Sequence, residues 1–449
     1  MNMMKQRTLV EAFDPRANSI GFLRWLMAFM VIFSHAGPLA GFYGGKDLGT
    51  QWSNEQSFGG VAVCGFFFFS GFLITKSRMG RSSTPRFFWR RAMRIIPAWW
   101  FTLIITAFVL GPIAWQREAG TSAGYFDATS DSPLTYFVNN MWLTIGQPNI
   151  AGMGETTVYG ASTWNGSAWT LLYEFRAYIL VGILGMVGAL SNRRVGGLVA
   201  VAIIGLSTLQ WTNVVPLGTI TPVLGDFVLL LLLAPFALGM LFSLYGERIV
   251  IDDRVAVAAG VIGAYTYATG GWLLIGQYLF CYVLMWVAIR ATFLQRWERF
   301  GDFSYGIYLS AWPLMQLAAY FELQRFGWVT YHLVIVLACH IWAYFSWHLV
   351  EKPAMSLKNW TPRPLAAALK KVQPAIDRLK RVLVDPRYSS TRTADSIRSV
   401  NSPPTPVTIG KVKQFGAGEQ VHAGEPIQYP RPLRDTDPEH APAGAEAAK

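Results

Sequence analysis

Long apolar runs recur along most of this chain and alternate with short polar segments. Between residues 20 and 350 we identify ten such runs, each close to the twenty or so residues that a helix needs to cross a bilayer. They lie at about 20–38, 58–76, 95–112, 168–190, 195–214, 221–245, 255–270, 272–290, 303–321 and 329–350. This pattern predicts an all-α protein, a polytopic membrane bundle of about ten transmembrane helices.

Composition and charge support this prediction and add an orientation. The chain of 449 residues is 52% hydrophobic and 14% charged, with a net charge of +12. Of the 22 Lys and Arg residues before residue 352, 17 lie on one set of alternating loops and 3 on the other. Because positive loops mark the cytoplasmic side, both termini are predicted to be cytoplasmic, in a multi-pass protein of the inner (plasma) membrane. The basic excess then reflects topology and attraction to membrane lipids, and no nucleic acid is expected as a partner.

The composition changes after Pro353 to Pro, Ser, Thr, Ala and charged residues. We therefore predict a transmembrane domain over residues 1–357 and a mostly disordered cytoplasmic tail over 358–449. Within the tail, residues 364–384 repeat apolar positions at helical spacing with Lys and Arg opposite, which indicates a basic amphipathic helix on the inner leaflet. Pro374 interrupts this pattern, so a simple linker is the alternative.

Two polar segments, 39–57 and 112–167, lie on the predicted outer side. The acidic residues of the second are too scattered for a metal site, and we expect a solvated surface. They are Glu118, Asp127, Asp131 and Glu155. Three aromatic residues near its end fit either stacking on sugar rings or anchoring at the membrane interface. They are Tyr159, Trp164 and Trp169.

The cysteines and the histidines of the last span do not have the spacing of a metal site. The scattered cysteines are expected to be small core residues. They are Cys64, Cys281 and Cys339. The histidines recur every eight residues, which separates neighbours by about 12 Å, too far for one ion. They are His332, His340 and His348, and we expect satisfied polar groups inside the bundle.

Arg24 and His35 lie inside the first predicted span. Ionisable residues are rare in hydrocarbon, and their default interpretation is a functional site that faces the bundle interior. The two residues are eleven positions apart, which is about three helical turns, so both project from one face about 16 Å apart. This face carries a fixed cation and a titratable base.

Arg91 and Arg94 lie three residues apart at the cytoplasmic start of the third predicted span, next to Arg90. Two guanidinium groups on one helix face can bind phosphates through bidentate hydrogen bonds. The alternative is that they only mark the cytoplasmic side. We favour phosphate binding.

Glu174 lies in the fourth predicted span, one to two turns below the outer surface. We expect it at the depth of His35, where a carboxylate would orient the imidazole and support its charged form. Glu174 is thus a third candidate catalytic residue. The alternative is that it pairs with Arg176 or another basic group to neutralise its charge.

These residues resemble the acyltransferase 3 family of integral-membrane O-acyltransferases. Arg24 and His35, with ten residues between them, are similar to that family's first-helix motif. The segment FFFFSGFLIT at 66–75 resembles its second-helix signature, and RRAMR at 90–94 contains its Arg-x-x-Arg. The segments NGSAWTLLYEF, SYGIYLSAWP and VEKP resemble three later motifs in the expected order. Together the six motifs span residues 20 to about 353.

The resemblance implies a ten-helix enzyme that moves an acyl group from cytoplasmic acyl-CoA to a hydroxyl of an envelope glycan or glycolipid. The group would be acetyl, with succinyl as the alternative, so acetyl-CoA is the expected donor and no metal is needed. His35 is the implied catalytic base, and Arg24 is its charged partner. The implied contacts for the coenzyme A phosphates are Arg90, Arg91 and Arg94. The acceptor would be an envelope glycan or a lipid-linked sugar, and envelope-biosynthesis proteins are candidate partners.

Two positions depart from the family pattern, because Cys64 stands where many members have Asp and Ala311 where many have His. The main alternative function is a transporter or flippase of a lipid-linked sugar, in which Arg24, His35 and Glu174 act as a proton relay. A scaffold whose basic tail recruits partners to the membrane is a third hypothesis.

Overall fold

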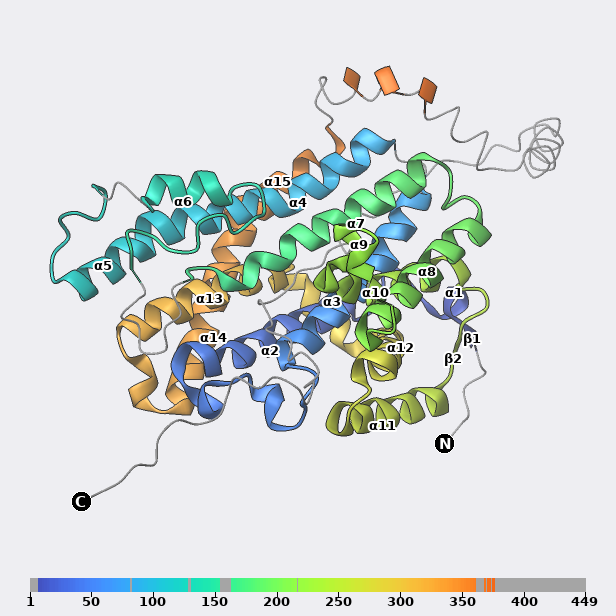
Figure 1. The fold of residues 1–449 in the computed structure, drawn as a ribbon, viewed down its shortest axis with the longest axis horizontal. Coiled ribbons are helices and arrows are strands. Elements are labelled where there is room, and N and C mark those ends of the chain that lie inside the picture. The colour runs from blue at the N-terminus through green and yellow to red at the C-terminus, as the bar shows by residue number, and fades with distance from the viewer. Residues whose placement is uncertain are drawn as a thin grey trace.

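The computed structural model describes residues 7–80, 83–127, 131–153, 163–215 and 217–360, with a few residues between 367 and 375. Its fold is all-α, which confirms the predicted class. In the described residues the one sheet pairs β1 (Arg7–Thr8) with the antiparallel β2 (Val250–Ile251). This short ladder fastens the N-terminal segment to the loop before α11 (Figure 1).

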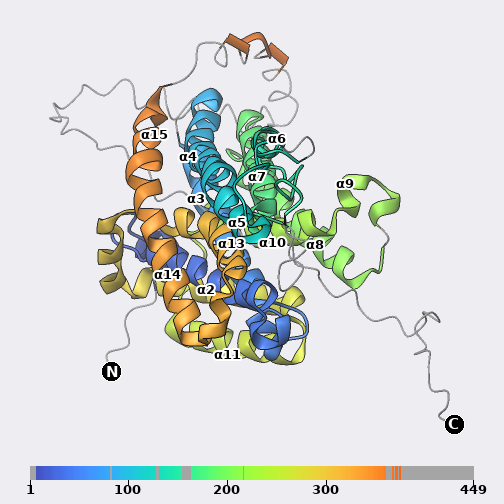
Figure 2. The same cartoon turned by 90° about the vertical axis from the view of Figure 1, so that its left-hand side faces the viewer.

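The helices form one elongated bundle (Figures 1 and 2). Its longer helices are α2 (Ile20–Ala40), α3 (Phe58–Met79), α4 (Thr84–Ile105), α7 (Trp169–Met186), α8 (Arg193–Thr212), α10 (Phe227–Tyr245), α11 (Asp253–Thr269), α12 (Gln277–Arg290), α13 (Ser304–Tyr320) and α14 (Trp328–Phe345). The shorter ones are α1 (Leu9–Ala12), α5 (Gly111–Ala119), α6 (Pro133–Asn140), α9 (Pro222–Gly225) and α15 (Lys352–Ser356).

Tighter and wider helical turns connect or extend these helices. The π-helical turns are η3 (Thr106–Leu110), η6 (Trp272–Gly276) and η9 (Ser346–Glu351). The 3-10 turns are η1 (Phe42–Gly45), η2 (Leu48–Gln51), η4 (Gly166–Ala168), η5 (Leu217–Thr219), η7 (Thr292–Phe300), η8 (Leu323–Phe326) and η10 (Leu357–Asn359).

Each of the ten predicted spans coincides with one of the longer helices. Within the described residues, eight helical runs are long and apolar enough to cross a membrane. The other two predicted spans correspond to α11 and α13, which have 17 residues each. At 1.5 Å per residue these helices are about 26 Å long, slightly less than the roughly 30 Å thickness of the hydrocarbon core.

Two helical runs are much longer than the sequence pattern predicted. One extends over Thr84–Ala119 and the other over Trp328–Asn359, with 36 and 32 residues. These lengths correspond to about 54 and 48 Å, so both runs continue beyond a bilayer core. Their ends lie side by side at α4 and α15 (Figures 1 and 2), where the Trp89 indole donates to the carbonyl oxygen of Leu357 at 2.8 Å. Trp360 packs edge-on against the same indole, at 5.1 Å between ring centroids.

Helix α3 forms the centre of the bundle, between α2, α10 and α12. Its aromatic run Phe66–Phe69 is completely buried. Glycines allow α3 and α10 to cross at very short range, since a Cβ on Gly71 would lie 1.9 Å from the carbonyl oxygen of Phe236. A Cβ on Gly239 would likewise lie 2.1 Å from the carbonyl oxygen of Phe68. Small residues at such crossings let membrane helices pack backbone to backbone, which explains the glycine of the SGFLIT segment.

The cysteines and the histidines of α14 and η9 behave as the sequence predicted. All three cysteines are buried and free, in agreement with their predicted core role. Each histidine donates from Nδ1 to the carbonyl of the residue four positions earlier, at 2.7–2.8 Å. His340 also accepts a hydrogen bond from the Trp25 indole at 3.0 Å. The three histidines are therefore satisfied polar groups, as expected.

Two predicted regions are covered only in part. Glu118, Asp127 and Asp131 are exposed, as expected of a solvated outer surface, whereas Glu155 lies outside the described residues. Most of the predicted amphipathic helix at 364–384 also lies outside them. Its described residues, between 367 and 375, are helical and exposed.

Candidate active site

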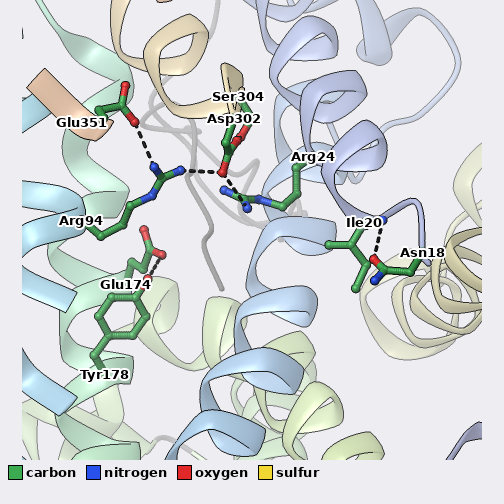
Figure 3. A network of polar contacts seen from close by, with 9 residues as sticks. All are labelled: Asn18, Ile20, Arg24, Arg94, Glu174, Tyr178, Asp302, Ser304 and Glu351. Atoms are coloured by element: carbon green, nitrogen blue, oxygen red, sulfur yellow. Dashed lines mark hydrogen bonds and ion pairs between the residues drawn. The ribbon is translucent and has the colours of Figure 1, made fainter. Parts of the chain in front are cut away.

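A cluster of buried charges joins the inner ends of several helices (Figure 3). Arg24 of α2 and Arg94 of α4 both bond to the same carboxylate oxygen of Asp302, at 3.1 and 2.7 Å. Both arginines are 1% exposed, whereas Asp302, just before α13, is 17% exposed. The two predicted basic sites, far apart in sequence, are thus held together by one carboxylate.

A second carboxylate, that of Glu351, also forms an ion pair with Arg94. Glu351, buried in the π-helical turn η9, contacts Arg94 at 3.1 Å and accepts a hydrogen bond from Ser346 at 2.8 Å. Ser304 donates in the same way to Asp302 at 2.6 Å. Each acid therefore has both an arginine and a hydroxyl partner, which offsets the cost of taking its charge out of water.

The arginines also set the charge state of Asp302. Burial by itself would raise the pKa of Asp302, but Arg24 and Arg94, with hydrogen bonds from Ser304, hold the pKa of this carboxyl below its usual value. Asp302 is therefore an anion at neutral pH.

Glu174 lies in α7 beside Arg94 (Figure 3). Its carboxylate accepts a hydrogen bond from Tyr178, one turn further along the helix. The charges that act on it belong to Arg24, Arg94 and Arg91. The structure thus places Glu174 at the depth of the charge cluster, and not at the depth of His35 as the sequence analysis expected. Arg176, the alternative partner, pairs instead with Asp226 at 3.2 Å.

Glu174 lies at this depth because the chain enters the bundle before α7 begins. The Trp312 indole of α13 donates to the carbonyl oxygen of Thr163 at 2.6 Å, so the chain is already inside the bundle there. The Tyr308 hydroxyl, one turn further inward on α13, donates to the carbonyl oxygen of Ser167. Since α7 starts only after this descent, Glu174 lies deeper than a helix that started at the outer surface would place it.

The same descent buries Trp164. Its ring stacks on Tyr320 with 5.8 Å between centroids, and it is 0% exposed. Trp164 is therefore neither a solvent-facing sugar platform nor an interfacial anchor. Trp169 packs edge-on against Tyr173 at 5.5 Å, and Tyr159 lies outside the described residues.

His35 lies in the outer half of α2 and is fully buried. Its imidazole packs edge-on against the Trp312 indole, with 4.9 Å between ring centroids. Arg24 is eleven residues away on the same helix, about 16 Å along its axis, and bonds to Asp302. The structure therefore separates an outer site around His35 and Trp312 from the inner charge cluster.

The three arginines of the RRAMR segment have different surroundings. Arg94 is held by two acids, and Arg91 is buried with its guanidinium 5.9 Å from the centre of the Phe87 ring. Arg90 is half-buried and donates to the Asn359 side chain at 3.2 Å. All three lie on α4 within one helical turn or slightly more, but these contacts differ from one arginine to the next.

Asp302 was missed by the sequence analysis. Its sequence gives only a weak signal, because an acidic residue two positions before the apolar SYGIYL segment needs a cation when helices pack around it. The sequence analysis included Glu351 only as part of the VEKP motif. Within the described residues, no group of three or more His, Cys, Asp and Glu side chains could hold a metal ion.

Comparison with known proteins identifies the family of this chain. Residues 18–359 match the family described as Acyltransferase domain. The chain belongs to the acyltransferase 3 family. This membrane acyltransferase is 27% identical to an O-acetyl transferase of Shigella phage Sf6, over 75% of this chain and 96% of that protein. It is also 27% identical to Nodulation protein 10 of Rhizobium leguminosarum bv. viciae, over 76% and 94% of the two chains.

A shorter match connects this acyltransferase to Acyltransferase MdmB of Streptomyces mycarofaciens, with 29% identity over 36% of this chain and 38% of that protein. No solved structure matches the chain.

The family motifs converge in the structure of this acyltransferase. Phe66 packs edge-on against Tyr308 at 6.5 Å, so the second-helix signature meets the SYGIYLSAWP segment. The two departures from the family pattern are buried. Cys64 lies 3.8 Å from the sulfur of Cys281, and Ala311 is fully enclosed in α13.

Proposed function

We propose that this protein is a membrane O-acyltransferase that moves an acyl group, acetyl in the first instance, from cytoplasmic acyl-CoA to a hydroxyl of a cell-envelope glycan or glycolipid. The observation that carries the proposal is a titratable imidazole, His35, buried in an apolar helix of an acyltransferase bundle. The printed name of the phage relative, an O-acetyl transferase, supports acetyl as the group and oxygen as its acceptor.

The donor would bind from the side that carries the basic loops, which we take to be cytoplasmic. Arg90 and Arg91 would hold the phosphates of coenzyme A through charge-assisted hydrogen bonds. Arg94 is already bound to Asp302 and Glu351, so it would reach a phosphate by releasing Asp302, the more exposed of the two acids. In this proposal the thioester would extend outward along α2 toward His35.

The reaction requires a proton acceptor, and His35 would supply it. The acceptor hydroxyl gives its proton to the imidazole while its oxygen bonds to the thioester carbonyl carbon, whose oxygen takes up the electron pair. Collapse of this tetrahedral intermediate breaks the C–S bond, and the coenzyme A sulfur leaves with the proton held by His35. The products are the ester and free coenzyme A.

Arg24 and Glu174 would support this reaction as positioning residues. Arg24 joins α2, which carries His35, to Asp302 ahead of α13, which carries Trp312. Glu174 joins α7 to the same cluster of charges. Both therefore hold the helices around the reacting groups without contact to the reacting atoms.

The test is transfer of labelled acetyl from acetyl-CoA by the purified full-length chain in membranes containing envelope glycans and glycolipids. His35→Ala is expected to reduce transfer by about 10²–10⁴-fold, the range over which a general base contributes. His340→Ala is the matched control, because this histidine also packs in the bundle but bonds only to Trp25 and Val336 among the described residues. It should retain most of the transfer.

Two results would contradict the proposal at different levels. If well-folded His35→Ala retained most of the transfer, the role of His35 as base would be wrong. If the wild-type protein neither transferred the acetyl group nor hydrolysed the thioester, the acyltransferase function would fail. The flippase alternative would then be tested by movement of a labelled lipid-linked sugar.

A further inference from the structure

Asn165 carries a buried amide that the proposed reaction has not yet used. The residue is 3% exposed, and its Nδ2 group has no hydrogen-bond acceptor among the described residues. Its Oδ1 atom accepts a hydrogen bond from the Ser167 hydroxyl at 3.2 Å. Buried polar groups in proteins are nearly always paired, so a buried donor held in place without an acceptor points to a ligand.

Trp312 connects Asn165 to His35. The residue after Asn165, Gly166, lies so close to the Trp312 indole that a Cβ there would be 2.6 Å from a ring carbon. The imidazole of His35 packs against the same indole at 4.9 Å between centroids. The backbone next to Asn165 and the imidazole of His35 therefore pack against the same indole.

The backbone around Asn165 adds partial positive charge. Asn165 precedes a helical run that begins at Gly166 and continues to Met186. The first N–H groups of any helix have no acceptor within the helix, and they give this end a partial positive charge. Asn165 makes no side-chain hydrogen bond that caps this end. The environment thus favours a group that accepts hydrogen bonds and develops negative charge.

We propose that Asn165 is a catalytic residue whose Nδ2–H donates a hydrogen bond to the thioester carbonyl oxygen as that oxygen becomes an oxyanion. This inference rests on the proposed acyltransferase function. The carbonyl oxygen gains the electron pair when the acceptor oxygen bonds to the acyl carbon, and it returns the pair when the C–S bond breaks. A neutral amide donor, fixed in a buried site, stabilises this charge without changing its own protonation. Ser167 positions the amide through its bond to Oδ1.

The experiment compares two substitutions of Asn165 in the full-length chain. Asn165→Ala removes the amide, and Asn165→Leu replaces it with an apolar side chain of similar shape. Loss of one oxyanion donor typically lowers kcat by 10²–10³-fold, and we expect both variants in that range. Because the Nδ2 group has no acceptor among the described residues, their unfolding temperatures should change little. The KM values for acetyl-CoA and for the acceptor should stay within about threefold, since this donor acts mainly in the transition state.

Asn140→Leu is the matched control, because Asn140 is equally buried but both ends of its amide bond to the backbone of Gln147, at 2.8 and 3.0 Å. We expect this control to unfold at a lower temperature and to retain its kcat per folded molecule. The opposite pattern at Asn165, a loss of kcat with stability retained, would distinguish catalysis from a structural role.

Three results would overturn the role of Asn165. They are a kcat within threefold of wild type in both variants, a kcat that falls only together with the unfolding temperature, and an effect confined to the KM of the acceptor. All three require an active wild-type protein. An inactive wild type would instead contradict the proposed function, on which the role of Asn165 depends.

Discussion

Buried ions are the distinctive residues of this protein. Three arginines and three acids lie near one another in the bundle, and all except the partly exposed Asp302 are buried. They are Arg24, Arg91, Arg94, Glu174, Asp302 and Glu351. A buried ion pair contributes little net stability relative to an apolar pair, but removal of one partner leaves a charge that the low dielectric cannot accommodate. The cluster therefore constrains which helices can meet.

Asp302→Asn is expected to destabilise the protein by about 3 kcal/mol, because it removes the charge of the carboxylate that Arg24 and Arg94 share. The pH dependence follows from the lowered pKa of Asp302. The ion pairs stabilise the folded state above the ordinary carboxyl pKa, and this stability is lost as the pH falls through the lower folded-state pKa. Wild type should thus lose stability below about pH 4, whereas the variant should lose less there. Thermal unfolding in detergent between pH 3 and 7 measures both effects.

Glu247→Gln provides the control for Asp302→Asn. The Arg193 guanidinium donates two hydrogen bonds to the Glu247 carboxylate, at 2.7 and 2.9 Å, but both side chains are more than half exposed. Exposed ion pairs contribute little, so the unfolding temperature of this variant should change much less. Equal shifts in the two variants would show that the buried position of Asp302 has no special importance.

At the scale of elements, the segment 163–168 determines the geometry of the outer site. It descends along α13 and brings Gly166 against Trp312, which also packs against His35. Irregular backbone at membrane depth is found where it is enclosed by protein or lines a cavity. In this protein it provides the buried amide of Asn165 and delays the start of α7.

Gly166→Ala should therefore disturb the site more than the fold. The added methyl group would lie 2.6 Å from the Trp312 ring, which is packed and cannot swing away freely. We expect a loss of stability of about 1–3 kcal/mol from overpacking, and a larger fall in acetyl transfer because the ring moves against His35.

Gly205→Ala is the control, since a Cβ at this position on α8 meets no described residue within 4 Å. It should leave transfer unchanged and stabilise α8 slightly. Transfer rates and unfolding temperatures of the two variants check the prediction. An equally active Gly166→Ala would show that the position of Trp312 does not matter.

At the scale of the whole molecule, two helical runs are longer than a bilayer core is thick, and their ends meet at α4 and α15. The contacts of Trp89 and Arg90 with Leu357, Asn359 and Trp360 join α4 to the end of the second run. We therefore propose that the transmembrane unit continues to Trp360, three residues past the boundary predicted at 357.

A chain truncated after Trp360 is expected to keep acetyl transfer within about twofold of the full-length protein, because all described helix contacts remain. A chain truncated after Ser356 loses the contacts of η10 and Trp360 with α4. It should unfold at a lower temperature. Transfer and unfolding of both truncated chains test the boundary. Loss of transfer after the first truncation would favour the scaffold hypothesis for the tail.

Much of this protein could be predicted from the sequence. Apolar runs of about twenty residues have few structures open to them in a bilayer, since backbone groups there must bond within a helix. The positions of the helices followed for this reason. Arg24 and His35 stood out because charge is rare in hydrocarbon, and the order of the motifs indicated the family that the comparisons show.

Only the tertiary structure decided which charges meet. Asp302 belongs to none of the motifs found in the sequence, yet it joins Arg24 to Arg94. These two arginines are 70 positions apart and lie on different helices. The depth of Glu174 depended on how far the chain descends before α7 begins, and helical periodicity carries no information about that. Sequence pattern reports which side of a helix is apolar, whereas pairing depends on the relative position of helices along the membrane normal, which packing alone determines.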